Sequence, residues 1–115
     1  IALVDFESRT VRYSGVGNIA GAVVTPGTSR QMVSHNGIVG VEARRFQEFE
    51  YPFPANARLV MHSDGLVSHW RIDKYQGIWM RHPALLAGLL YRDFTRGRDD
   101  VTVVVASERR EGGAT

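Results

Sequence analysis

Two acidic turns adjoin the two most apolar segments of this chain. Ser63-Asp64-Gly65 follows residues 59–61, and Arg98-Asp99-Asp100 precedes residues 101–105. Apolar runs that are rich in β-branched residues and lack polar alternation are typical of strands buried on both faces, so we predict that both strands lie inside a sheet. If they pair antiparallel, the end of the first lies beside the start of the second, and Asp64 and Asp99 converge at one edge of the core.

Two carboxylates that converge at a core edge indicate a bound cation. At about 5 Å they repel by roughly 3 kcal/mol at an effective dielectric near 20, which is large beside a net domain stability of about 5 to 15 kcal/mol. Carboxylate oxygens suit Mg²⁺ or Mn²⁺, and the absence of Cys excludes thiolate zinc sites and cysteine nucleophiles. Each turn alone is also typical of ordinary surface structure. Their conjunction favours a metal site.

Hydrophobic periodicity elsewhere predicts several strands and one clear helix. The helix is expected to begin near Pro83 and to end at Gly97. Its apolar stripe consists of Leu86, Leu89, Leu90 and Phe94. Strands are predicted over residues 1–6, 11–14, 19–25, 30–34 and 46–51, the first three as an antiparallel meander. Residues 66–80 receive no assigned element, and their aromatic side chains form either a lid or partner surface, or plain core.

The order of these motifs resembles a known family. Ser63-Asp64-Gly65-Leu66 after an apolar strand, then a helix, then Asp99-Asp100-Val101-Thr102 before a final strand resembles the metal-dependent serine/threonine phosphatases of the type 2C (PPM) class. The stage II sporulation E and sigma-factor regulator branch is the closer match, since residues 15–19 and 36–40 fall where that branch has a Gly-Asn hairpin and a short Gly-containing loop. The resemblance runs from residue 1 to about residue 106.

The resemblance implies an α+β fold in which antiparallel β-sheets are flanked by helices, the αββα sandwich of type 2C phosphatases. Residues 1–107 would be the C-terminal part of such a domain, so the fold would be partial here. Residues 108–115 are predicted to be a disordered polar tail. A run that opens on Ile1 inside a strand-like segment, without an initiator Met, also leads us to expect a piece of something longer.

The resemblance also implies a mechanism and a set of residues. Two Mn²⁺ or Mg²⁺ ions would activate a water that attacks the phosphorus of phosphoserine or phosphothreonine in line, so no protein nucleophile is needed. By motif, Asp64 and Asp99 match metal ligands, whereas Asp100 and Gly65 would support them without binding metal. Arg98 is a candidate for the substrate phosphate, with a local counter-ion role as the alternative. The family's metal-bridging Asp has no counterpart in this chain.

The substrate implied by the resemblance is a phosphorylated signalling protein, such as an anti-sigma-factor antagonist. The alternative is a phosphatase-like sensor or protein-binding module without turnover. An upstream Asp-Gly-x-Gly-like turn would favour the enzyme. Separately, His62 shares strand parity with Asp64, and a half-buried structural histidine is the preferred interpretation.

Charge and hydropathy exclude several other classes. The net charge of +2 comes from Arg residues scattered along the chain, which does not predict a nucleic-acid surface. No apolar stretch approaches the roughly 18 residues of a membrane span and no leader is evident, so the cytoplasm is the expected location. If half of the domain is missing, exposed apolar strand edges would make this piece prone to self-association.

Overall fold

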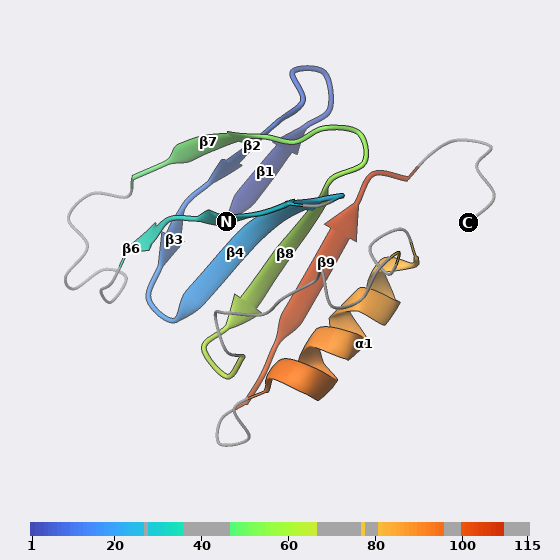
Figure 1. Ribbon diagram of the computed structural model, residues 1–115. Coiled ribbons are helices and arrows are strands. Elements are labelled where there is room, and N and C mark those ends of the chain that lie inside the picture. Colours follow the sequence, from blue (N-terminus) through green and yellow to red (C-terminus); the bar gives the residue numbers. More distant parts are fainter. Residues whose placement is uncertain (27, 36–46, 67–76, 78–80, 96–99, 110–115) are drawn as a thin grey trace.

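The computed structural model describes residues 1–26, 28–35, 47–66, 77, 81–95 and 100–109, which form two antiparallel sheets and one helix (Figure 1). The three-stranded sheet has the order β1 (Ala2–Asp5), β2 (Thr10–Tyr13), β7 (Phe49–Pro52). The four-stranded sheet has the order β5 (Thr28–Met32), β4 (Ile19–Thr25), β8 (Arg58–Ser63), β9 (Val103–Ser107). Two short strands, β3 (Gly15–Val16) and β6 (Ser34–His35), pair parallel. The helix α1 spans Pro83–Phe94.

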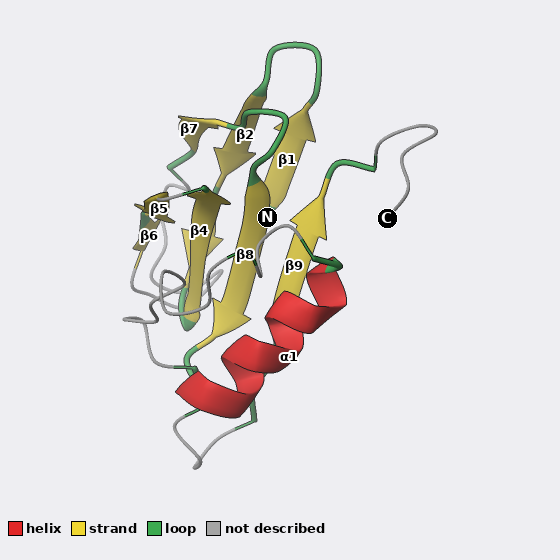
Figure 2. Ribbon diagram, turned by 45° about the vertical axis from the view of Figure 1, so that its right-hand side comes forward, coloured by secondary structure: helices red, strands yellow, loops and turns green. Residues whose placement is uncertain are grey.

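The four-stranded sheet is the central layer, with the three-stranded sheet on one face and α1 on the other (Figure 2). Side chains along β8 alternate between the two faces of the sheet. Leu59 packs in the core between the sheets, and Val60 packs in the core beneath the helix. Each fully buried aliphatic side chain contributes about 1.5 to 3 kcal/mol. The described residues thus form three layers, β/β/α, which match part of the predicted αββα sandwich and confirm the α+β class.

The predicted meander is wrong at its third strand. β2 pairs with β1 and β7, whereas β4 lies in the other sheet. The chain changes sheets at Gly15, where an added Cβ atom would clash with the side chains of Tyr13 and Ser34, so a larger residue would force a shift. Gly17 then turns the chain with φ of 87°. Periodicity reports which strands are half-buried but not which sheet each strand joins.

β9 corrects the prediction that both apolar strands lie inside a sheet. β8 does lie between β4 and β9, but in the part of the chain that the structure describes β9 pairs only with β8. Val103 and Val105 pack on the helix side. Val104 shares the opposite face with Met61 and is 52% exposed. The apolar run of residues 101–105 therefore leads into a strand that is buried on one face and lies at the edge of the described sheet.

The helix begins at Pro83, as predicted, and His82 caps it by accepting a hydrogen bond from the Ala84 N–H at 3.1 Å. Leu86 and Leu90 of the predicted stripe are fully buried. The helix ends at Phe94, earlier than expected, because Thr95 adopts extended backbone and bridges to Leu66. Within the described residues, no helix has the length and apolar character needed to cross a membrane.

Several predicted features lie outside the described residues. These are residues 36–40, most of residues 66–80, Gly97, Arg98, Asp99 and the end of the tail.

Candidate functional site

The register of β8 and β9 brings Asp64 and Asp100 to one end of the four-stranded sheet. The strands pair antiparallel and their last paired residues are His62 and Val103. Asp64 therefore follows β8 at the same end at which Asp100 precedes β9, and both side chains are exposed. The predicted antiparallel pairing is confirmed. We call the end of the sheet where Asp64 and Asp100 lie the acidic edge.

Asp64 sits in a tight turn closed by main-chain contacts. The Leu66 N–H donates to the Ser63 carbonyl at 3.3 Å, which leaves Asp64 and Gly65 as the central residues of the turn. The Ser63 N–H donates across to the Thr102 carbonyl at 3.0 Å. The turn is thus attached to the segment that leads from Asp100 into β9.

Gly65 explains how closely the two turns approach. A Cβ atom at this position would lie 2.6 Å from the carbonyl oxygen of Asp100 and 2.6 Å from Cγ2 of Val101. Real Cβ atoms do not reach such distances to main-chain atoms without a shift of the backbone. Glycine is therefore required for this contact.

The fit of a divalent cation depends on how many oxygen donors converge. Asp64 and Asp100 are the acids of the two turns that the structure describes, and Asp99 and Arg98 lie outside the described residues. Among described residues, no group of three or more His, Asp or Glu side chains could hold a metal ion. The donors are of the type that Mg²⁺ and Mn²⁺ use, but the described set is too small for a complete site. No chemical step follows from these residues alone.

The His62 side chain forms a hydrogen bond with the main chain. It is 4% exposed, and its Nδ1 lies 2.9 Å from the Ser63 carbonyl oxygen. Because a carbonyl oxygen only accepts, Nδ1 carries the proton in this contact. The sequence favoured a half-buried structural histidine, and the structure shows His62 to be buried.

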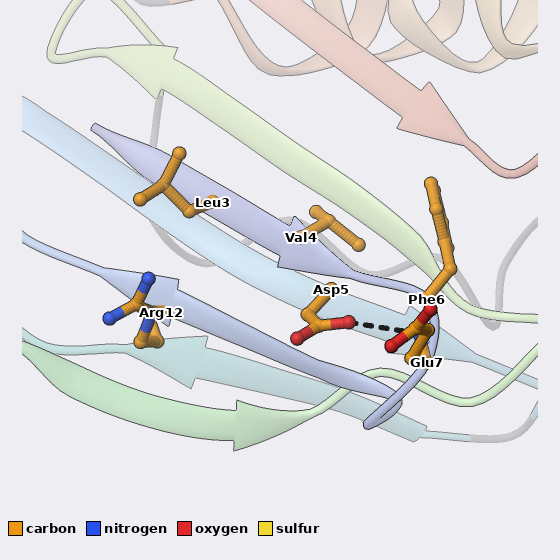
Figure 3. A pocket seen from close by; sticks show the side chains of 6 residues that line it. All are labelled: Leu3, Val4, Asp5, Phe6, Glu7 and Arg12. Atoms are coloured by element: carbon orange, nitrogen blue, oxygen red, sulfur yellow. Dashed lines mark hydrogen bonds between the residues drawn. The ribbon is translucent and has the colours of Figure 1, made fainter.

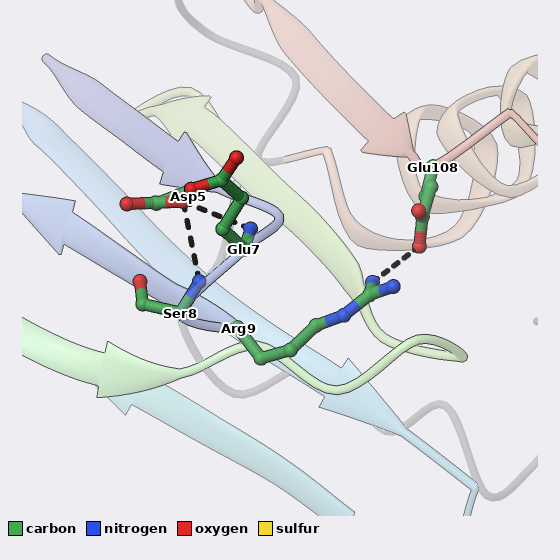
Figure 4. Close-up of polar contacts among 5 residues, drawn as sticks. All are labelled: Asp5, Glu7, Ser8, Arg9 and Glu108. Carbon is green, nitrogen blue, oxygen red and sulfur yellow. Dashed lines mark hydrogen bonds and ion pairs between the residues drawn. The ribbon is translucent and has the colours of Figure 1, made fainter.

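A surface cavity of about 510 Å³ lies far from the acidic edge, on β1 and β2 (Figure 3). Its lining residues are Leu3, Val4, Asp5, Phe6, Glu7 and Arg12. The Asp5 carboxylate accepts hydrogen bonds from the main-chain N–H groups of Ser8 and Glu7, and these bonds lower the pKa of Asp5 (Figure 4). Asp5 is therefore a turn cap, and sequence reasoning had no signal that marked this cavity.

The charged side chains of Arg9 and Arg58 also have structural partners. The Arg9 guanidinium pairs with Glu108 at 2.5 Å, which ties the β1–β2 turn to the residue after β9 (Figure 4). Glu108 is the first residue of the predicted tail. Arg58 is buried, donates to the Arg81 carbonyl, and its Nη1 has no hydrogen-bond partner among the described residues. Burial lowers the pKa of the Arg58 guanidinium.

Comparison with known proteins agrees with this architecture. The family model described as Stage II sporulation protein E (SpoIIE) matches residues 1–109. The phosphatase domain of the cell fate determinant SpoIIE from Bacillus subtilis has a similar structure, with a TM-score of 0.66 and 18% identity over 98% of this chain and 56% of that chain. No curated protein matches this chain.

Two further solved structures share the fold. RsbX in complex with magnesium gives a TM-score of 0.65 and 20% identity over 89% of this chain and 50% of that chain. A chain of the bacterial stressosome, a modular system adapted to control secondary messenger signaling, gives a TM-score of 0.74 and 20% identity over 89% of this chain and 54% of that chain. This chain thus spans about half the length of the solved structures it matches.

The two-sheet fold and the family match place this chain in the PPM class of phosphatases. Within that class, it belongs to the Stage II sporulation protein E (SpoIIE) family, as the order of its motifs predicted.

Proposed function

We propose that residues 1–107 are the C-terminal part of a PPM phosphatase domain whose intact form removes phosphate from phosphoserine or phosphothreonine in a bacterial signalling protein. The observation that carries this proposal is the family match over residues 1–109, and the position of Asp64 and Asp100 at one end of the four-stranded sheet supports it. The substrate that we propose is a phosphorylated regulator of a sigma factor, such as an anti-sigma-factor antagonist. The proposed location of the protein is the cytoplasm.

Asp64 and Asp99 are the proposed ligands of Mn²⁺ or Mg²⁺, with two ions expected in the complete domain. Support comes from the oxygen chemistry of the two turns and from the magnesium complex of RsbX. When bound, such ions activate water and neutralise charge on the phosphoryl oxygens. Asp100 would hold its neighbour in place, and Arg98 would bind the substrate phosphate. At least one further acid from outside this chain is needed to complete the site.

Phosphatase activity of the intact protein tests this proposal. We expect hydrolysis of a phosphoserine or phosphothreonine protein substrate in saturating Mn²⁺, and loss of that activity in excess chelator, because the proposed ligands are all oxygen donors. Residues 1–115 alone should show little or no turnover, since two acids bind a hard cation weakly. Turnover that persists unchanged in chelator would refute the metal mechanism. An intact protein that binds the substrate without hydrolysing it would instead favour the non-catalytic sensor or binding module.

A further inference from the structure

The main-chain donors in the first turn of α1 bond to a single residue, His82. The first helical residue is Pro83, which has no N–H to donate. The Ala84 N–H donates to Nδ1 of the His82 ring at 3.1 Å. The Leu85 N–H donates to the His82 carbonyl at 2.9 Å. One of these two bonds therefore ends on a ring nitrogen rather than on an oxygen.

A ring nitrogen accepts a hydrogen bond only while it carries no proton. In this contact the His82 ring is therefore neutral, with its hydrogen on Nε2. An imidazolium carries a hydrogen on both nitrogens and accepts at neither. Histidine changes charge between about pH 5 and pH 8. The side chains most often found at this helix position, those of Ser, Thr, Asp and Asn, keep an acceptor oxygen over that range.

The start of the helix already has two cationic neighbours. The buried Arg58 guanidinium of β8 donates to the carbonyl of Arg81, the residue before His82. The Arg81 side chain is exposed, and the first turn of α1 contains no acid. An imidazolium at position 82 would therefore be a further cation at the positive end of the helix dipole, where cations are destabilising.

The other element that packs against α1 is β9, and it carries no charged residue. Glu108 and Arg109 follow it, and Glu108 pairs with Arg9. The charged pair of α1 itself, Arg92 with Asp93, lies near the opposite end of the helix. On the described elements, loss of the ring acceptor and the added positive charge thus act in the same direction.

We propose that His82 is a pH-sensitive switch at the start of α1, which holds the first turn while its imidazole is neutral and releases it on protonation. The bond is present at neutral pH and is lost as the pH falls, so acid loosens the helix start. The Arg81 carbonyl bonded to Arg58 precedes this turn, so release weakens the attachment of α1 to β8. Removal of an N-cap acceptor typically shifts the equilibrium about fivefold. The inference is independent of the proposed phosphatase activity.

Two variants of the intact protein separate the cap from its titration. In His82→Asn the side chain still accepts but does not titrate, and in His82→Ala no acceptor is left. Urea unfolding at about pH 7.5 and about pH 5 gives the unfolding equilibrium constant of each protein. We expect acid to raise the wild-type constant about fivefold more than that of His82→Asn. At the higher pH, His82→Ala should exceed wild type about fivefold, and it should respond to acid no more than His82→Asn does.

A nuclear magnetic resonance titration of the wild-type protein measures the bond itself. We expect the amide proton resonance of Ala84 to move with the titration of the His82 ring, and that of Gly88, inside α1, to stay in place. An Ala84 resonance that does not move while the ring titrates would overturn the inference. Equal responses to acid in wild type and His82→Asn would overturn it as well. Both comparisons remain decisive if His82→Ala does not fold.

Discussion

At the scale of single residues, the acidic edge depends on two small side chains, Ser63 and Gly65. Ser63 supplies a hydroxyl that bonds to the β9 side of the ladder. Gly65 supplies the missing Cβ that lets the Asp64 turn lie against the Asp100 backbone. Both residues stand in the motif Ser63-Asp64-Gly65. The family resemblance implied a supporting role for Gly65, whereas no role was predicted for the Ser63 hydroxyl. A strand-end serine before an Asp-Gly turn is the signal that would have identified the hydroxyl.

The close approach at Gly65 predicts that a methyl group there destabilises the fold. We expect Gly65→Ala to lower the free energy of unfolding by about 1 to 3 kcal/mol, since main-chain atoms of Asp100 must shift. Gly88→Ala is the matched control, because Gly88 lies inside α1 with no atom within 4 Å of the added Cβ. That change should stabilise by about 0.5 to 1 kcal/mol. Denaturant midpoints measure both, and a Gly65→Ala protein as stable as wild type would contradict the contact.

At the scale of elements, the sequence predicted the features that depend on the local pattern of residues. The bounds of β4 agree with the prediction over residues 19–25, and α1 begins at Pro83 with Leu86 and Leu90 buried. The transfer of β4 to a second sheet and the edge position of β9 were not predicted. Both depend on pairing between segments distant in the sequence, which hydrophobic periodicity does not encode. The antiparallel pairing of β8 and β9, which brings Asp64 and Asp100 to one end of the sheet, could be predicted because it needs only one strand pair. The predicted convergence of Asp64 and Asp99 lies outside the described residues.

Two of the edge strands in the described sheets, β1 and β9, favour self-association of residues 1–115. Among the described strands, β1 and β9 each pair on one side only, and they carry Leu3 at 54% and Val104 at 52% exposure. Unpaired apolar edges favour edge-to-edge contact. We expect the sedimentation coefficient of the wild-type chain to rise between a low and a high protein concentration.

The double variant Leu3→Lys with Val104→Lys should remain monomeric, since charges on edge strands block pairing. Leu85→Lys is the control, because Leu85 is 47% exposed on α1 and belongs to neither edge strand. This control should still self-associate. A wild-type chain that sediments as a monomer at both concentrations would show that the edges are harmless.

At the scale of the whole molecule, the chain carries a sheet-on-sheet core and one covering helix of a PPM fold. It spans about half the length of the solved structures that share this fold. Its acidic edge carries carboxylate oxygens of the type that bind Mg²⁺ or Mn²⁺. Among the described residues, however, no three His, Asp or Glu side chains come together as a metal site. We propose Asp64 and Asp99 as metal ligands in this chain, and the family resemblance implies that the metal-bridging acid comes from sequence beyond it.

Comparing two neighbouring acids in the intact protein tests this account most directly. With saturating Mn²⁺, we expect Asp99→Asn and Asp64→Asn each to lower the rate of phosphoprotein hydrolysis by about 10²- to 10³-fold, as expected when a charge-stabilising group is removed. Asp100→Asn should be far milder, because Asp100 supports its neighbour without binding metal. Circular dichroism confirms that each variant is folded. Equal rates for folded Asp99→Asn and Asp100→Asn would contradict the assignment of the metal ligands.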